Sequence, residues 1–282
     1  MDMTSDNSIN SENHEHPLPM EEYLFDLHGY TLIKKALDKE HIRAMNDWLN
    51  ALPPLDVDQW YGPIDVQSYG GIDGVNLQNI IEAGELFERL IDHPSWIGRI
   101  RYYTGNRYQP MINEAFINLR ESGGYIGVHS GGHVPDFRIN SGRSGGEWCC
   151  SYLTLLVALN DVGPGDGATV VIPSSHKADF PHPMQSDNAG ISKGPGDKIE
   201  GAVEIHCNAG DALLLNDYAC HGSAARTNPG ERRMVIFRYL PSPFAQRFGH
   251  VPSEDFLNRL TPERRALVQL GPPRRPSSEM TP

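Results

Sequence analysis

The amino-acid sequence predicts a mainly β protein with flanking α-helices, arranged as a β-sandwich or barrel. From residue 108 onward, short apolar runs alternate with Gly, Pro and Asp, which is the pattern of many short strands joined by turns. Gly and Pro are plentiful, with 28 and 22 residues, and they favour turns over long helices. The helical patterns come earlier in the chain, so we expect the helices to cover one sheet.

The elements before residue 108 are predicted mainly from their terminal signals. Residues 23–33 are typical of a strand interrupted by a turn. Asp38 begins an amphipathic helix that ends before the proline pair at Pro53. Residues 80–91 and 94–104 are also predicted to be helical. The strands expected after residue 108 span residues 115–119, 125–129, 148–159, 169–172, 202–206, 211–215 and 234–240.

One domain is expected over residues 19–262, between two polar ends. Residues 1–18 are rich in Asn, Ser, Asp and Glu, and residues 263–282 contain several Pro, Ser and Arg, so both are predicted to be tails. No apolar run reaches the length of a membrane span, and no signal-peptide pattern opens the chain. A cytoplasmic protein without a membrane partner is therefore expected.

The charge balance limits the possible partners. A formal net charge of -12 argues against a nucleic-acid polymer, because such binding needs a basic surface. A small phosphorylated ligand stays compatible with this charge, since it needs only a few local cations. The cysteines fit no zinc-binding spacing and are expected to be reduced and buried. They are Cys149, Cys150, Cys207 and Cys220. The sequence leaves the oligomeric state open.

Two histidines are candidate metal ligands. The chain has 12 histidines, and none is followed two positions later by Asp or Glu. His129 ends one predicted strand, and His221 follows another 92 positions later. In a closed double sheet, two such strands can be neighbours and direct both imidazoles into one cavity, where imidazole suits Fe, Zn, Cu and Ni alike. His133 is an alternative to His129, and a purely structural histidine is the alternative to both.

Arg232 is a candidate for binding an anionic co-substrate. It lies eleven positions after His221, beyond the turn at 227–230, and it begins an apolar strand. A strand that returns beside the one leading to His221 would carry a guanidinium into the cavity, where it could hold a carboxylate through two parallel hydrogen bonds. Arg233 is the competing residue, and strand alternation allows only one of the two to face inward.

Several short motifs together resemble the phytanoyl-CoA dioxygenase family. They are the runs at 159–168, 172–177 and 210–213, followed by His221-Gly222-Ser223 and then Arg232. Each motif is weak alone, and the set is specific in aggregate. The resemblance covers roughly residues 20–245, which is a whole domain by the usual size range.

The resemblance implies both a fold and a chemistry. It implies a double-stranded β-helix, also called a jelly roll or cupin-like fold, and an oxygenase that uses Fe(II), 2-oxoglutarate and O2. It further implies that His129 and His221 bind the iron and that Arg232 binds the C5 carboxylate of 2-oxoglutarate. Asn118 and Ser223 are candidates for further contacts with this co-substrate.

The chain departs from the family pattern at Gly131. The usual His-x-Asp is His129-Ser130-Gly131 in this sequence. This is similar to the Fe(II)/2-oxoglutarate halogenases, in which Gly or Ala replaces the carboxylate and a chloride restores the charge and the coordination of the metal. The resemblance therefore implies a halogenase that chlorinates an unactivated C–H bond of a small molecule, with Gly131 marking the chloride position.

A nucleoside monophosphate is the first candidate substrate, because the architecture most resembles halogenases that act on deoxyadenosine monophosphate. Candidate substrate contacts are Arg138, Arg143 and Lys177 for a phosphate and Trp148 for a base. Two alternatives remain. One is a hydroxylase of the same fold that uses another carboxylate, Asp136. The other is a jelly-roll binding module without redox chemistry.

Overall fold

The structure of the protein is a computed structural model, and it describes residues 8–10, 16–68, 72–106, 108–130, 142–144, 146–178, 180–185, 191–242 and 251–269. Within these residues the strands form a nine-stranded sheet, a three-stranded sheet and a two-stranded hairpin. In spatial order, the large sheet contains β1 (Ser8–Asn10), β2 (Tyr30–Lys34), β12 (Ala212–Asn216), β9 (Leu153–Ala158), β14 (Arg232–Pro241), β6 (Pro110–Arg120), β5 (Val75–Gln78), β4 (Ile64–Gln67) and β3 (Gln59–Tyr61). The small sheet contains β11 (Val203–Ile205), β10 (Thr169–Val171) and β13 (His221–Ser223), and the hairpin joins β7 (Gly142–Ser144) to β8 (Glu147–Cys149).

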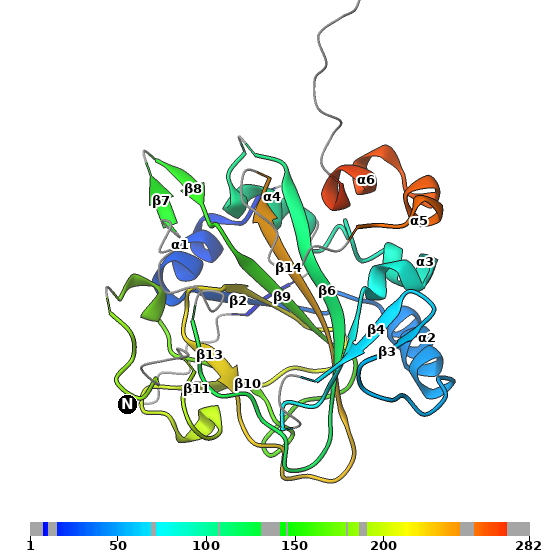
Figure 1. Ribbon diagram of the computed structural model, residues 1–282. Helices are drawn as coiled ribbons and strands as arrows, with labels where there is room; N and C mark the ends of the chain where they lie inside the picture. Colours follow the sequence, from blue (N-terminus) through cyan, green and yellow to red (C-terminus); the bar gives the residue numbers. More distant parts are fainter. Residues whose placement is uncertain are drawn as a thin grey trace, which may run out of the picture.

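The two larger sheets lie opposite each other. Figure 1 shows β10, β11 and β13 facing the part of the large sheet that holds β2 and β9. Their side chains share one cluster, in which Val171 and Ile205 of the small sheet pack with Leu156, Leu213 and Met234 of the large sheet. This arrangement confirms the mainly β fold with flanking helices and the double-stranded β-helix that the family resemblance implied.

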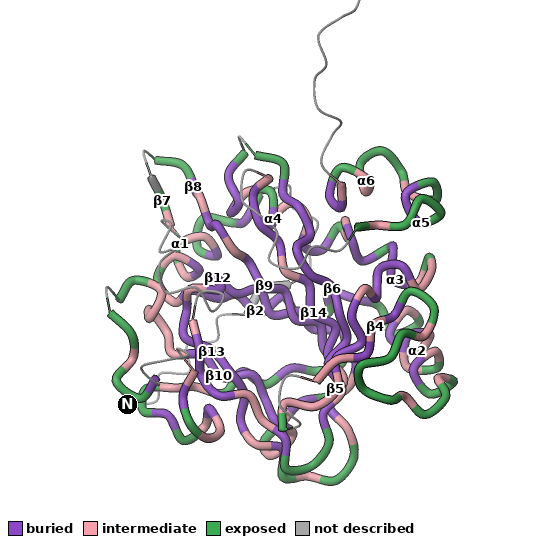
Figure 2. The backbone as a smooth tube through the Cα atoms, in the orientation of Figure 1, coloured by how far each residue is buried: buried purple, intermediate pink, exposed green. Residues whose placement is uncertain are grey.

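Helices cover the other face of the large sheet. They include α1 (Pro19–His28), α2 (Lys39–Asn50), α3 (Glu85–Glu88) and α4 (Ile97–Thr104). Phe25, Met45 and Ile100 of these helices pack in one apolar cluster with Ile117 and Val235 of the sheet. In Figure 2 the strands at the centre are buried, whereas the outer loops are largely exposed. The remaining helical segments are η1 (Ile80–Ala83), η3 (Ser175–Lys177), η4 (Gly196–Lys198), α5 (Glu254–Arg259) and α6 (Pro262–Val268).

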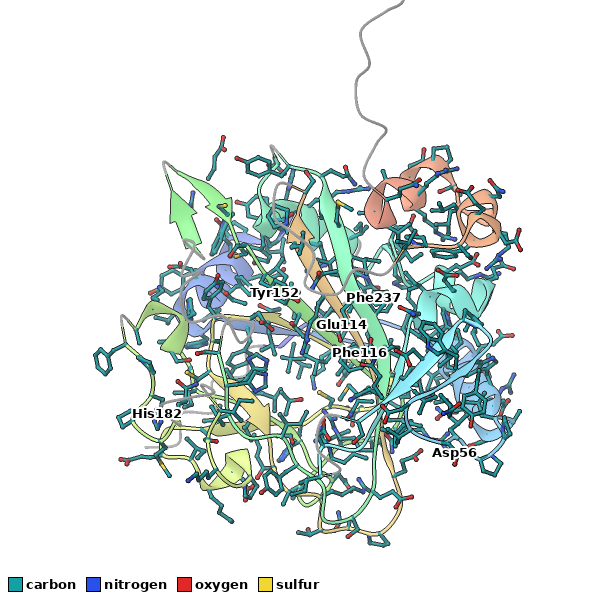
Figure 3. The ribbon with its side chains drawn as sticks, viewed as in Figure 1. Asp56, Glu114, Phe116, Tyr152, His182 and Phe237 are labelled. Carbon is teal, nitrogen blue, oxygen red and sulfur yellow. The ribbon has the colours of Figure 1, made fainter. Side chains whose placement is uncertain are left out.

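Strand alternation divides the central strands into two kinds of side chain. On β14, Val235 and Phe237 belong to the cluster that packs against the helices, whereas Met234 and Ile236 belong to the cluster between the two sheets. The neighbouring strand β6 repeats the pattern, because Ile117 packs toward the helices and Phe116 packs between the sheets. Figure 3 labels Phe116 on β6 and Phe237 on β14 near the centre of the molecule. Every second residue of these strands therefore faces the interior between the sheets.

The helix predicted to begin at Asp38 is confirmed. The Asp38 side chain accepts a hydrogen bond from the backbone N–H of His41 at 2.8 Å, and α2 ends at Asn50. The strand predicted at 23–33 is wrong in its first half, because residues up to His28 form α1. Gly29 ends this helix with a φ of 83°, a left-handed conformation that favours glycine, and β2 then begins at Tyr30.

Four further differences concern boundaries. The apolar run at 148–159 is divided between β8 and β9, and the strands β3, β4 and β5 were not predicted. Helix α6 buries Leu267 and Val268, so the domain continues past the expected start of a tail at 263. Strand β1 pairs with β2 in parallel inside the region 1–18 that was expected to be a tail. In each case the packing against the rest of the chain outweighs the local composition.

Among the described residues, no helix has the length and apolar character needed to span a membrane.

Candidate metal centre and anion pocket

His129 and His221 face each other across the start of the small sheet. Their backbones form an isolated antiparallel bridge, in which the N–H of each histidine donates to the carbonyl of the other at 2.8 Å. Their ring centroids are 4.4 Å apart, and both residues are buried. The chain therefore brings together two imidazoles that are 92 positions apart in the sequence.

The two rings make the same hydrogen bond through Nδ1. Nδ1 of His129 lies 2.9 Å from the carbonyl oxygen of Gly127, and Nδ1 of His221 lies 2.8 Å from the carbonyl oxygen of Ala219. Because a carbonyl oxygen can only accept, each Nδ1 must carry the hydrogen in these bonds. In its neutral form, each ring then has its lone pair on Nε2, and this is the form of histidine that binds a metal.

A buried carboxylate that the sequence reasoning missed lies beside this pair. Oδ1 of Asp217 is 3.6 Å from Nε2 of His221, and it accepts a hydrogen bond from Oγ1 of Thr154 at 2.6 Å. Burial raises the pKa of the Asp217 carboxyl, but the charges of His221 and Arg238 and the Thr154 hydrogen bond outweigh burial and leave this pKa below its usual value. Asp217 precedes His221 by four positions, and this spacing is the only signal of it in the sequence.

The side chains around the histidine pair are two imidazoles and one carboxylate. As the side chains stand, the described residues contain no group of three His, Cys, Asp or Glu side chains that could hold a metal ion. His129 and His221 form a two-ligand arrangement, and Asp217 is the carboxylate that contacts it. Two adjacent buried imidazoles are donors that fit an Fe(II) ion, which accepts imidazole and carboxylate ligands.

Arg232 points into the interior between the sheets and is fully buried. Its Nη1 donates to Oδ1 of Asn118 at 3.3 Å, and its Nη2 donates to Oγ1 of Thr169 at 3.1 Å. Its Nε is buried and has no hydrogen-bond partner. A buried guanidinium with an unused N–H is suited to receive an anion.

A second buried arginine, Arg120, lies next to Arg232 and was not predicted. Its Nη1 donates to Oγ of Ser223 at 2.6 Å, and its Nη2 donates to Oδ1 of Asn118 at 3.1 Å. The side-chain oxygen of Asn118 therefore accepts a hydrogen bond from each of the two guanidinium groups. The structure thus joins three predicted co-substrate residues, Asn118, Ser223 and Arg232, through one residue that sequence reasoning did not find.

The electrostatics of the two arginines favour an anionic ligand. Burial lowers the pKa of Arg232 to about 10, and burial together with the neighbouring charge of Arg232 lowers the pKa of Arg120. Within the described part of the chain, neither guanidinium forms an ion pair with a carboxylate. The nearby charge of Asp73 partly opposes the lowering of the Arg120 pKa. Two adjacent buried cations are costly unless an anion compensates them.

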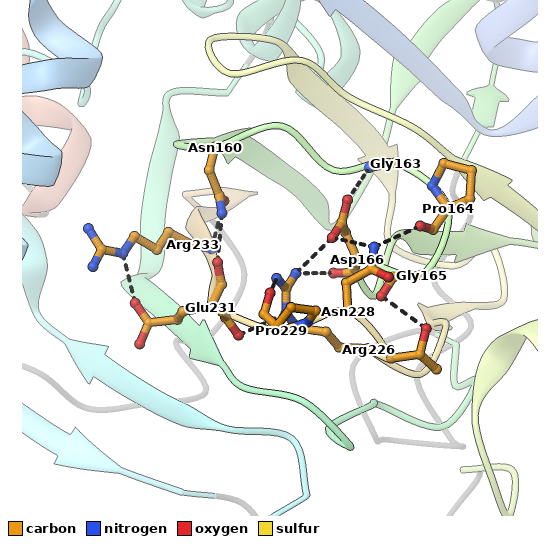
Figure 4. A network of polar contacts seen from close by, with 12 residues as sticks. Asn160, Gly163, Pro164, Gly165, Asp166, Arg226, Asn228, Pro229, Glu231 and Arg233 are labelled. Atoms are coloured by element: carbon orange, nitrogen blue, oxygen red, sulfur yellow. Dashed lines mark hydrogen bonds and ion pairs between the residues drawn. The ribbon is translucent and has the colours of Figure 1, made fainter.

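Arg233 lies on the opposite side of β14. Its Nε donates to Glu231 at 2.7 Å, and its Nη1 donates to Asn46 of α2 at 2.9 Å. Figure 4 shows Arg233 with Glu231 and Asn160, well separated from the turn formed by Asp166 and Arg226. Alternation along β14 therefore directs Arg232 inward and Arg233 outward. This agrees with the expectation that only one of the two faces the interior.

The loop at 163–167 is a turn and not a phosphate-binding loop. Asp166 accepts from the backbone N–H of Gly163 at 3.0 Å and from Asn228 at 3.0 Å. Arg226 donates to the backbone carbonyl of Asp166 at 3.0 Å, so the two loops hold each other (Figure 4). The polar groups of this loop are used in its own structure.

Three of the predicted substrate residues lie in the described part of the chain, and all three contact acidic residues of α1. Trp148 is buried against Phe25 and Tyr103, and its Nε1 donates to Glu22 at 2.7 Å. The ring of Trp148 belongs to the apolar core, and its stacking on a base stays a prediction. Arg143 also pairs with Glu22, at 3.0 Å.

Lys177 forms an ion pair with Asp26 at 3.0 Å. Glu22 and Asp26 are one turn apart on α1, so Arg143 and Lys177 both lie along this helix with their charges already compensated.

Four other residues of interest lie outside the described residues: Gly131, His133, Asp136 and Arg138.

The cysteines show no disulfide. All four are free, and Cys150, Cys207 and Cys220 are buried. Burial raises the pKa of the Cys207 thiol to about 12, so this thiol stays protonated near neutral pH.

Comparison with known proteins identifies the family. The model of the phytanoyl-CoA dioxygenase (PhyH) family matches residues 25–234. The chain belongs to this family. It is thus a member of a family of Fe/2-oxoglutarate-dependent oxygenases, and no curated protein matches it closely enough to add more.

Solved structures with the same fold include three enzymes. HygX from Streptomyces hygroscopicus, with nickel and 2-oxoglutarate bound, has a TM-score of 0.67 and 21% identity, over 85% of this chain and 94% of HygX. The epimerase SnoN, in complex with Fe3+, alpha ketoglutarate and nogalamycin RO, has a TM-score of 0.60 and 18% identity, over 82% and 86% of the two chains. The carbocyclase SnoK from nogalamycin biosynthesis has a TM-score of 0.57 and 16% identity, over 83% and 87%. At these identities the likeness extends to the fold alone.

Proposed function

We propose that the protein is an Fe(II)/2-oxoglutarate-dependent oxygenase that hydroxylates an unactivated C–H bond of a small molecule. The observation that carries this proposal is the pairing of His129 and His221, whose buried rings lie with their centroids 4.4 Å apart and whose Nδ1 atoms both bond to carbonyl oxygens, so that iron would bind through Nε2 of each ring. Bound iron and 2-oxoglutarate supply an O2-dependent oxidation that releases succinate and CO2.

The residues around the histidines have separate tasks. Arg232 and Ser223 receive the C5 carboxylate of 2-oxoglutarate, because the Nε of Arg232 is unused and Oγ of Ser223 lies 2.6 Å from the second guanidinium, that of Arg120. Asn118 orients both arginines through one oxygen. Phe116 and Ile236 contribute to the apolar cluster between the sheets, which excludes water and strengthens these charge interactions.

Chlorination is the second candidate function, and Gly131 is the observation that favours it. In that case chloride takes the position of the missing carboxylate, and the product carries chlorine in place of hydrogen. The difference between the two candidates therefore depends on whether a carboxylate of the chain binds the ion. We place hydroxylation first because the family to which the chain belongs is named for a dioxygenase.

A nucleoside monophosphate is the first substrate to test. Arg143 and Lys177 lie along one side of α1, bound to Glu22 and Asp26, and the exposed fractions of their side chains are 50% and 46%. A phosphate would have to compete with these two carboxylates for the cations. We therefore expect Arg143 and Lys177 to contribute only modestly to substrate affinity.

The test is aerobic incubation with Fe(II), 2-oxoglutarate, chloride and a panel that begins with nucleotides. Mass spectrometry would detect a product that has gained one oxygen atom, or the isotope pair of chlorine, and succinate formation would be measured in parallel. The proposal predicts succinate and an oxygenated product. A protein that neither binds 2-oxoglutarate with Fe(II) nor forms succinate with any substrate is a binding module, and the proposal fails.

A further inference from the structure

We propose that Arg120 and Arg232 form a binding site for a doubly charged tetrahedral oxyanion, such as inorganic phosphate, at the end of the interior where 2-oxoglutarate is proposed to bind. The oxyanion occupies this place when 2-oxoglutarate is absent and competes with it when both are present. The competition rests on the proposed function, whereas the binding of an oxyanion by the metal-free chain does not.

The site is built from two facing pairs of residues. Arg232 of β14 and Arg120 of β6 are partners in the register of the large sheet, and Thr169 of β10 and Ser223 of β13 are partners in the register of the small sheet. Arg232 donates to Thr169 at 3.1 Å and Arg120 donates to Ser223 at 2.6 Å, so each cation meets one hydroxyl of the opposite sheet. All four residues are at most 3% exposed, and the two positive charges therefore lie in a buried frame between the sheets.

This frame holds more hydrogen-bond donors than the described residues supply acceptors for. Each guanidinium has five N–H groups. Arg232 makes two hydrogen bonds and leaves its buried Nε without a partner, and Arg120 makes three. Oγ of Ser223 accepts from Arg120 and from the backbone N–H of Ile126 at 2.8 Å, so its own O–H is left to donate. Buried donors without acceptors are costly, and an oxyanion supplies acceptors to several of them at once.

The two cations contact only neutral groups within the described residues. Both share Oδ1 of Asn118, and Nε of Arg120 donates to the backbone carbonyl of Asp73 at 3.1 Å. Burial raises the pKa of the Cys207 thiol near Arg232 to about 12, so this thiol adds no negative charge near neutral pH. The carboxyl charge of Asp73 acts on Arg120 from nearby without forming an ion pair. The frame therefore leaves two buried positive charges for a ligand to compensate.

Two positive charges favour a ligand with two negative charges. A carboxylate brings one charge and two oxygens in one plane, which match the fork of a single guanidinium. A tetrahedral oxyanion brings its charges on oxygens that point in several directions, so it can accept from both arginines and from the Ser223 hydroxyl. One carboxylate of 2-oxoglutarate compensates one of the two cations, whereas a dianion compensates both.

The experiment measures anion binding to the full, metal-free chain by isothermal titration calorimetry. Sulfate is the probe because it carries two charges throughout the neutral pH range, and acetate is the singly charged comparison at the same ionic strength. We expect sulfate to bind at least ~10-fold more tightly than acetate, since each added hydrogen bond to a charged group contributes on this scale. Phosphate above neutral pH should bind like sulfate. A wild type that binds sulfate no better than acetate overturns the inference.

Two variants test whether the binding depends on the second arginine. Arg120→Gln should lower the sulfate affinity by ~10-fold or more and bring it close to that of acetate. Arg233→Gln is the matched control, because Arg233 lies on the opposite face of β14 with Glu231 and Asn46, and it should keep the wild-type affinity. Chemical denaturation shows whether each variant folds. A folded Arg120→Gln with unchanged sulfate affinity contradicts the proposal, and the wild-type comparison of the two anions decides the matter if this variant does not fold.

A final titration separates this inference from the proposed function. The anaerobic Fe(II) complex is titrated with 2-oxoglutarate at several sulfate concentrations, and the apparent dissociation constant should rise in proportion to sulfate. Binding of 2-oxoglutarate that sulfate does not weaken overturns the competition and leaves the proposed function intact. A chain that binds sulfate but not 2-oxoglutarate keeps the oxyanion site and removes the proposed function.

Discussion

The two faces of strand β14 show how differently one strand can be used. Val235 and Phe237 pack against the helices in an apolar cluster, whereas Arg232 and Arg238 face the interior between the sheets. Arg238 donates to Glu114 of β6 at 2.6 Å and lies over the ring of Phe116. The outer face carries one charge, Arg233, which is partly exposed at the start of the strand, whereas the inner face carries two.

This difference separates residues that stabilise the fold from residues that serve a site. Buried apolar side chains on the outer face contribute to stability through packing. Within the described residues, Arg120 and Arg232 have no carboxylate partner, and buried cations of this kind lower stability unless an anion binds them. Substitutions on the two faces should therefore affect different measurements.

The largest effect is expected from the histidine pair. His129→Ala or His221→Ala removes one of the two imidazole nitrogens, so Mn(II) and Fe(II) affinity should fall by more than ~100-fold and turnover should be lost. Electron paramagnetic resonance of Mn(II) measures this directly. His206→Ala is the control, because His206 is an exposed histidine that contacts Glu204. Equal losses in all three variants would contradict a specific site.

The outer face is tested with Phe237→Ala. Phe237 is fully buried in the cluster beneath the helices, so its truncation should lower the free energy of unfolding by about 3–5 kcal/mol. Chemical denaturation measures the change. The folded variant should keep wild-type affinity for Mn(II) and for 2-oxoglutarate. A selective loss of ligand affinity without a loss of stability would reverse the assignment of the two faces.

The anion pocket is tested with Arg232→Gln and Arg120→Gln. Each change removes a buried cation, so 2-oxoglutarate binding should weaken by about 2–5 kcal/mol, which is ~25-fold or more. Anaerobic titration of the Fe(II) complex with 2-oxoglutarate measures this. Arg233→Gln is the matched control on the outer face of the same strand, where it bonds to Glu231 and Asn46. Its 2-oxoglutarate affinity should equal that of the wild type.

The smallest effects are expected along α1. Arg143→Ala and Lys177→Ala remove exposed ion pairs, so each should change the free energy of unfolding by less than ~1 kcal/mol. If these cations bind a substrate phosphate, the KM for a nucleoside monophosphate should rise a few-fold while that for the nucleoside stays constant. Steady-state kinetics with both compounds decides this, and equal changes for both would exclude a phosphate contact.

Local patterns in the chain were sufficient for several features. Short apolar runs broken by Gly and Pro predicted the β architecture, and Asp38 marked the start of α2. Strand alternation predicted that only one of Arg232 and Arg233 faces inward, and the structure shows that it is Arg232. These predictions succeed because they depend on residues close in sequence, where the periods of strands and the signals at helix ends act directly.

Features that depend on pairing between distant strands could not be found in this way. Arg120 joins Ser223 across 103 positions, and Asp217 meets Thr154 across 63, because the register of the sheets brings them together. Trp148 was a candidate contact for a base, and only the structure shows that α1 and α4 enclose its ring. A sequence carries the types of side chain that a site needs, but which of them share the interior depends on strand register and on helix packing, and these follow from the folding of the whole chain.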